Sequence, residues 1–144
     1  MPVLRKELVV DRPIWVVWAF ISDFANSQVW DPGVASARKG TEGDVRVGTR
    51  YYLQVLFNGK QMPMTYEVTA YDPPNRVELR GDGAPITAID DIRFTATPEG
   101  GTRIDYVADI RLKGVLKIAA PLLGGKFAAT GRAAIEGMRA ALLA

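Results

Sequence analysis

The sequence contains no cysteine and no histidine in its 144 residues. Without cysteine there are no disulfides, no thiolate nucleophile and no cysteine-ligated metal. Without histidine there is no Ser-His or Cys-His catalytic pair and no histidine-ligated zinc or iron. Any proton transfer would therefore fall to Asp, Glu, Tyr or water. The lack of cysteine also suits a reducing compartment.

Long apolar runs are missing as well. The N-terminal stretch MPVLRKELVVD carries charges where a signal peptide needs its apolar segment. Near the C-terminus the apolar residues are interrupted by Lys117, Pro121, Lys126 and Arg132. No stretch approaches the roughly 18 uninterrupted apolar residues that a transmembrane helix requires. We expect no transmembrane segment and a cytoplasmic location.

The charges balance closely, with 18 Lys and Arg against 16 Asp and Glu, for a net charge of +2. They are interspersed, and no basic cluster is longer than a pair such as Arg38-Lys39, so we expect no nucleic-acid partner. The glycines of 123–126 lack the spacing of a phosphate-binding loop, and no GxGxxG motif follows a predicted strand. We therefore expect no metal and no cofactor. Hydrophobic residues make up 48% of the chain, which favours one globular domain over residues 1–144.

The N-terminal third alternates between one strand and short helices. A strand is predicted over 4–10, followed by a helix with Asp11 as its N-cap and Pro13 in its first turn. A second helical turn is predicted over 24–29, ending at the break formed by residues 30–33. The first helix carries apolar residues at spacings of three and four, which predicts one buried face made of Ile14, Val17, Trp18 and Ile21.

Strands dominate the middle of the chain, and one long helix ends it. Short turns such as Asn58-Gly59 join the strands, which predicts an antiparallel meander whose edge strand is 34–39. The C-terminal stretch 114–144 is the only segment long and apolar enough for a major helix, and we expect it to lie across the sheet. The predicted strands are 34–39, 49–57, 62–71, 76–80, 86–97 and 102–112.

Alternation of polar and apolar residues predicts which side chains face the core. The clearest case is 102–112, where charges at 103, 105, 109 and 111 face water. Arg50, Asp91 and Arg93 are expected on the outer face, so they become site candidates only if this facing is reversed. The predicted inward residues are Tyr51, Leu53, Val55, Phe57, Tyr66, Val68, Ala70, Val77, Leu79, Ile92, Phe94, Ala96, Ile104, Tyr106, Ala108 and Ile110.

The order strand, two helices, six strands, long helix is the helix-grip arrangement. The stretch VDRPIWVVWAFISDFANSQVWDPGV resembles the opening signature of the START-like SRPBCC superfamily, with Pro13, Val17, Trp18, Asp23 and Trp30 at its familiar places. DPPNRVELR and PEGGTRIDY resemble internal turns of that superfamily, and LKGVLKIAAPLLG resembles its helix entry. The similarity is closest to bacterial polyketide cyclase/dehydrase-like proteins. It implies an α+β fold in which a curved antiparallel sheet of about seven strands wraps around the C-terminal helix.

The same resemblance implies a hydrophobic small molecule held between sheet and helix. Small residues on the long helix favour a cavity there: Ala119, Ala120, Gly124, Gly125, Ala128, Ala129, Gly131, Ala133, Ala134 and Gly137. The alternative is a dry core, completed by Phe127, Ile135, Met138 and Leu142. The predicted ligand-binding residues are Tyr51, Leu53, Val55, Tyr66, Val68, Leu79, Ile92, Phe94, Tyr106, Ala108, Phe127, Ile135 and Met138.

Several polar and large residues have two possible roles. The hydroxyls of Tyr51, Tyr66 and Tyr106 either orient a ligand or bond a neighbouring carbonyl or water. Met62 and Met64 line either the cavity mouth or plain core. Asp23 either caps the second helix or lies at the cavity rim. Trp15, Trp18 and Trp30 are expected to anchor the N-terminal helices to the sheet. No catalytic residue is identified.

Three functions remain open. The first is binding or transport of a lipid, polyketide-like or isoprenoid compound. The alternative is an aromatic polyketide cyclase or dehydratase, as the resemblance suggests, acting by substrate positioning. The third is a protein-interaction module. Pro121 with Gly124-Gly125 also predicts a kink in the long helix, and we hypothesise that its first half is a mobile gate.

Overall fold

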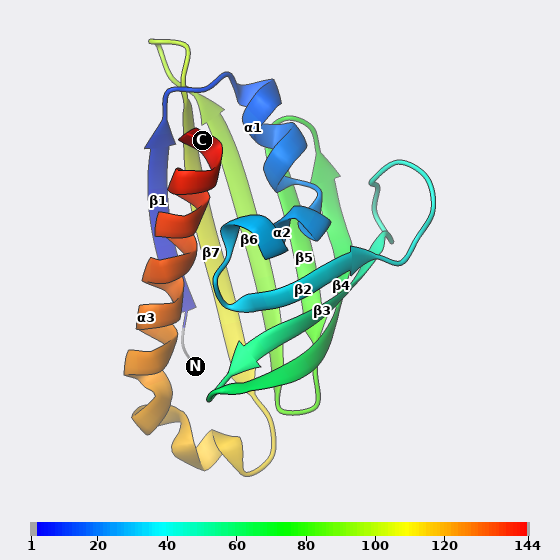
Figure 1. Cartoon of the computed structure of the whole chain (residues 1–144), viewed down its shortest axis with the longest axis vertical. Helices are drawn as coiled ribbons and strands as arrows, with labels where there is room; N and C mark the ends of the chain where they lie inside the picture. Colours follow the sequence, from blue (N-terminus) through cyan, green and yellow to red (C-terminus); the bar gives the residue numbers. More distant parts are fainter. Residues whose placement is uncertain (1–2, 144) are drawn as a thin grey trace.

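One curved sheet of seven antiparallel strands and one long helix make up most of the protein (Figure 1). The computed structural model describes residues 3–143, apart from the side chain of Ala120. Ala144, the end of the predicted helix, lies outside this range. The elements are β1 (Val3–Val10), α1 (Ile14–Ile21), a 3₁₀ turn (Phe24–Asn26), α2 (Ser27–Trp30), β2 (Val34–Lys39), β3 (Arg50–Phe57), β4 (Lys60–Asp72), β5 (Arg76–Asp82), β6 (Ile86–Ala96), β7 (Thr102–Leu112) and α3 (Leu116–Leu143).

The sheet order β1-β7-β6-β5-β4-β3-β2 pairs the first strand with the last and leaves β2 at the opposite edge. This confirms the helix-grip fold, the meander and the edge strand. One facing prediction is wrong. A bulge shifts the register between Val68 and Ala70, so Ala70 lies opposite Glu78 on the outer face, and Tyr71 packs on the core instead. Ala96, also predicted to face inward, is exposed at the end of β6.

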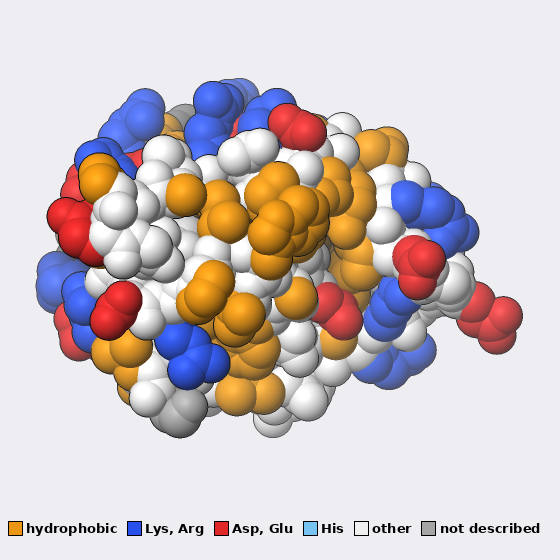
Figure 2. All heavy atoms as spheres, turned by 90° about the horizontal axis from the view of Figure 1, so that it is seen from above, with side chains coloured by type: hydrophobic (Ala, Val, Ile, Leu, Met, Phe, Trp, Pro, Cys, Tyr) orange, Lys and Arg blue, Asp and Glu red, His pale blue; other side chains and the backbone are white. Residues whose placement is uncertain are grey.

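The buried face of α1 is as predicted, but its N-cap and the position of Trp15 are not. Val17, Trp18 and Ile21 are buried, and the Trp18 ring lies 5.1 Å from that of Phe94. The N-cap is Pro13, in an extended conformation and without a side-chain capping bond, so Asp11 is not the cap. Trp15 falls on the outer face, where it is 60% exposed, and it anchors nothing. Figure 2 views this end of the molecule and shows hydrophobic side chains among the charged ones on its surface.

The two halves of α3 differ in packing. Figure 1 shows the helix changing direction near its start, in the part that contains Pro121. Here Ile118 and Leu122 are each 84% exposed. The second half packs against β1 and α2, and it buries the predicted stripe of Phe127, Ile135, Met138 and Leu142.

The small residues of α3 mostly do not face the sheet. Gly124 and Gly125 are exposed, and a Cβ at either would meet open space. Gly137 serves helix packing, because a Cβ there would lie 2.0 Å from the carbonyl oxygen of Trp30. Only Gly131 and Ala134, among those described, line a cavity. Ala120 lies outside the described side chains. The abundance of small residues was therefore a poor argument for a cavity, although a cavity is present.

Candidate functional site

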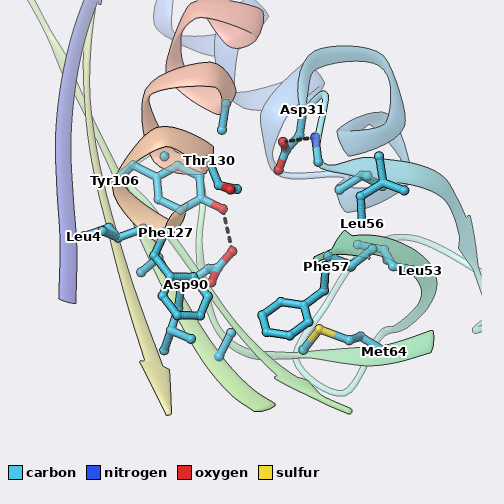
Figure 3. A pocket seen from close by; sticks show the side chains of 18 of the residues that line it. Leu4, Asp31, Leu53, Leu56, Phe57, Met64, Asp90, Tyr106, Phe127 and Thr130 are labelled. Carbon is cyan, nitrogen blue, oxygen red and sulfur yellow. Dashed lines mark hydrogen bonds between the residues drawn. The ribbon is translucent and has the colours of Figure 1, made fainter. Parts of the chain in front are cut away.

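A cavity of about 140 Å³ lies between the sheet and the second half of α3 (Figure 3). For comparison, a dry cavity of about 150 Å³ in another protein accommodates benzene. The cavity therefore has room for a group the size of one aromatic ring. Its apolar lining consists of Leu4, Phe24, Val34, Leu53, Val55, Leu56, Phe57, Met64, Ile86, Ala88, Ala108, Ile110, Phe127, Ala134 and Ile135.

The predicted ligand-binding residues divide into two groups. Seven line the cavity: Leu53, Val55, Tyr66, Tyr106, Ala108, Phe127 and Ile135. The other six are buried in packed core and do not line it: Tyr51, Val68, Leu79, Ile92, Phe94 and Met138. Trp18 explains part of this division, because its ring covers Phe94 and Tyr71. A side chain that faces inward can either line the cavity or belong to the packed core, and the strand pattern alone does not distinguish the two.

Asp90 is a buried acid in this lining that we did not predict. It lies on β6 in phase with Ala88 and Ile92, and it is 6% exposed. Its Oδ2 accepts a hydrogen bond from the Tyr106 hydroxyl at 2.5 Å (Figure 3). Burial raises the pKa of Asp90 to about 7, although the bond from Tyr106 opposes the rise. The same burial, with the carboxyl group of Asp90, raises the pKa of Tyr106.

Asp31 is a second acid in the lining, placed by the loop after α2. Its Oδ1 accepts a hydrogen bond from the backbone N–H of Gly33 at 2.8 Å. Burial raises the pKa of Asp31 to about 6, and the Gly33 N–H partly offsets this. Figure 3 shows the Asp31 and Asp90 side chains on different sides of the same space. The two acids interact, since Asp31 contributes to the raised pKa of Asp90.

The three inward tyrosines have different surroundings. Tyr106 bonds Asp90, whereas Tyr66 lines the cavity with no hydrogen bond to another described residue. The Tyr66 ring lies against the backbone of Gly81, where an added Cβ would be 2.4 Å from its Cζ. Tyr51 is away from the cavity, and its enclosed hydroxyl has no well-placed partner in the described part of the chain. Burial and then the neighbouring Asp23 raise the pKa of Tyr51.

The other polar candidates lie elsewhere. Asp23 accepts a hydrogen bond from the backbone N–H of Ala25 and so caps the 3₁₀ turn. Asp91 faces outward and forms ion pairs with Arg76 and Arg93. Arg50 is likewise on the outer face, paired with Glu67. The facing predicted for Arg50, Asp91 and Arg93 is therefore correct.

The cavity rim joins the tip of the β3–β4 hairpin to α3. The rings of Phe57 and Phe127 are 6.1 Å apart, and Lys126 Nζ donates to Asn58 Oδ1 at 2.6 Å. Met64 lines the cavity, whereas Met62 is buried beside it in the core.

Two further findings concern residues 3–143. Within that range no group of three or more His, Cys, Asp or Glu is arranged to hold a metal ion. No helix in the same range is both long and apolar enough to span a bilayer.

A protein-family model described as polyketide cyclase / dehydrase and lipid transport matches residues 1–144. The chain belongs to this family. The match bears out the resemblance to polyketide cyclase/dehydrase-like proteins. Among curated proteins, no sequence matches.

Several solved structures share the fold of this polyketide cyclase/dehydrase and lipid transport protein at low sequence identity. TTHA0849 of Thermus thermophilus superposes with a TM-score of 0.82 at 18% identity, covering 99% of this chain and 97% of its own. The Zhui aromatase/cyclase of Streptomyces sp. R1128 gives 0.82 at 14% identity, with coverages of 99% and 93%. A START superfamily protein of Mycobacterium smegmatis gives 0.76 at 14%, with 97% and 98%. These likenesses show the fold alone.

Proposed function

We propose that the protein binds an apolar small molecule in the cavity between the sheet and α3. The observation that carries the proposal is the cavity itself, whose lining is apolar apart from a few polar groups. Such a combination is typical of small-molecule sites, where apolar contacts give affinity and a few polar groups orient the ligand. The family description, which includes lipid transport, supports the same role.

The cavity volume limits how the ligand is held. One ring or a short chain fits within about 140 Å³. A lipid, polyketide-like or isoprenoid ligand would place one end inside and extend past the rim at Phe57 and Phe127. We expect its contacts to be Leu53, Val55, Tyr66, Tyr106, Ala108, Phe127 and Ile135. The six predicted residues in packed core would act only by supporting this lining.

A cavity-filling substitution tests the proposal. Ala108→Leu adds three carbons on the lining, and it should weaken binding of a neutral one-ring probe such as toluene by about tenfold, since each carbon of the probe that it displaces from the cavity loses roughly 0.8 kcal/mol of burial. Val107→Leu is the matched control, because Val107 is the next residue along β7 and is absent from the lining. Equal binding by both variants and the wild type would sink the proposal. Native mass spectrometry of protein purified from its own host would independently show a co-purified apolar compound.

A second candidate function, cyclisation or dehydration of a polyketide-like chain, is favoured by the Asp90–Tyr106 pair. A carboxyl group whose pKa is near 7 can give and take a proton at neutral pH, and here it is bonded to a phenol inside the cavity. The cavity would supply positioning. Asp90→Asn and Tyr106→Phe should each lower turnover of a poly-β-ketone substrate by about a hundredfold, the contribution typical of an acid–base group. Unchanged turnover in both variants would remove the proposed role.

A further inference from the structure

We propose that the acidic part of the cavity lining, made by Asp31 and Asp90, binds a basic nitrogen, so that the ligand is an apolar amine in its protonated form. This inference rests on the proposed binding function and deepens it by naming the ligand's polar group. It depends on three observations, namely two acids that line one apolar cavity, a tyrosine hydroxyl in the same lining that has no partner among the described residues, and the absence of a cation bonded to either acid among those residues.

The first observation concerns the hydrogen bonds of Asp90. One oxygen accepts from Tyr106, and no described residue donates to the other. A donating Tyr106 hydroxyl suits both the protonated acid and its carboxylate, and once Asp90 ionises near pH 7 it can only accept. A carboxylate in an apolar site is stabilised by pairing and hydrogen bonds. The free oxygen of Asp90 is not fully enclosed and lines the cavity, so a ligand N–H group can reach it there.

The second observation is Tyr66, which approaches from β4. The residue is 7% exposed, lines the cavity, and has no hydrogen-bond partner in the described part of the chain. Its hydroxyl is close enough to Asp90 and Asp31 to interact with both charges. Unlike the hydroxyl of Tyr51, that of Tyr66 is not fully enclosed, so it is accessible from the cavity, where an N–H group of a ligand can bond it.

The third observation is the charge around the cavity. The titratable groups that line it are Lys6 on β1, Asp31 after α2, Tyr66 on β4, Asp90 on β6 and Tyr106 on β7, while α3 contributes the uncharged Thr130. Lys6, the one cation among these described residues, forms no hydrogen bond or ion pair with Asp31 or Asp90. Two acids therefore line the cavity, and neither is paired with a cation among the described residues.

These features discriminate among three kinds of polar group. A ligand carboxylate would meet two acids and no paired cation, so it would be repelled. A neutral hydroxyl would satisfy one hydrogen bond and gain no ionic attraction. An ammonium has three donors and one positive charge, so it can bond the free oxygen of Asp90 and is attracted by the charge of Asp31 as well. Charge-assisted bonds of this type are about twice as strong as neutral ones.

The decisive experiment compares three probes with one skeleton: phenylpropylamine, phenylpropanol and phenylpropanoate. We expect isothermal titration calorimetry of the wild type at neutral pH to show the amine binding about tenfold more tightly than the alcohol, with the carboxylate weakest. The amine's affinity should rise between about pH 5 and pH 8, because Asp31 and Asp90 ionise in this range. The amine itself stays protonated throughout, since its pKa is about 10. The alcohol's affinity should stay flat or fall.

A pair of neighbouring variants locates the effect. Asp90→Asn should lower amine affinity about tenfold and change alcohol affinity by less than about twofold, whereas Asp91→Asn, on the outer face of the same strand, should change neither. Asp31→Asn should give a smaller loss for the amine. Thermal melts would verify folding, and the wild-type probe series stands even if a variant fails to fold. If the alcohol or the carboxylate binds as tightly as the amine, the inference fails and the binding function stands. If none of the three binds but toluene does, the inference alone fails; if toluene does not bind either, both fail.

Discussion

The concave face of the sheet has a packed half and a hollow half, and the same strands run through both. On β6, Ile92 and Phe94 lie in the packed half, whereas Ile86 and Ala88 line the cavity. The difference arises from what lies opposite. Trp18 covers Phe94, while the cavity is bounded by α3 and the β3–β4 hairpin. The alternation along a strand determines which side chains face inward. The elements that cover the sheet determine which of those side chains line a cavity.

The largest expected difference between the halves is in the cost of truncation. Ile92→Ala should lower the free energy of unfolding by about 4 kcal/mol, because it leaves a new void in close-packed core. Ile86→Ala should cost about half as much, since its side chain already borders empty space and has fewer contacts to lose. Urea denaturation measures both. Equal losses would mean that the cavity is closed in solution.

The second prediction concerns pH and the acids of the hollow half. The unfolded chain loses the Asp90 proton near pH 4, whereas the folded protein keeps it until about pH 7. Asp90 therefore destabilises the fold as pH rises through this window, by on the order of 2–4 kcal/mol. Asp31 adds a smaller loss that ends near pH 6.

The comparison of Asp90→Asn with the wild type isolates this effect. The variant's advantage in unfolding free energy should grow from about pH 4 to pH 7 and then level off. Asp91→Asn is the control: burial raises the pKa of Asp91, but the hydrogen bonds from Arg76 and Arg93 outweigh this and hold that pKa below its usual value, so the difference between this variant and the wild type should stay constant from about pH 4 to pH 7. A constant difference between Asp90→Asn and the wild type would show that Asp90 is solvated.

The third prediction contrasts two glycines of α3. Gly137→Ala should destabilise the protein by about 2 kcal/mol, because the new Cβ would overlap the Trp30 carbonyl oxygen, against which the second half of α3 packs. Gly124→Ala meets open space in a helix and should stabilise by about 0.5–1 kcal/mol. Melting temperatures should therefore move in opposite directions. A loss in both variants would indicate that the exposed start of α3 is packed in solution.

The sequence predicted the fold well because alternation and turn signals are local. Strand 102–112 coincides with β7, and the four family-like stretches occur in the order that the fold requires. Asp90 could have been predicted to face the core, since it alternates in step with Ala88 and Ile92 on β6. Asp31 could not, because its place in the lining depends on how α2 packs against the sheet. Gly137 was misread because a small residue can mark close packing as well as empty space.

An NMR titration of the wild type with phenylpropanol tests the central contrast most directly. The account predicts that amide shifts concentrate on the hollow half, at Leu53, Ala88, Ala108 and Ile135. Leu79, Ile92 and Phe94 in the packed half, and Ile118 and Leu122 at the exposed start of α3, should barely move. Saturable shifts centred on the packed half, or on the exposed start of α3, would contradict it.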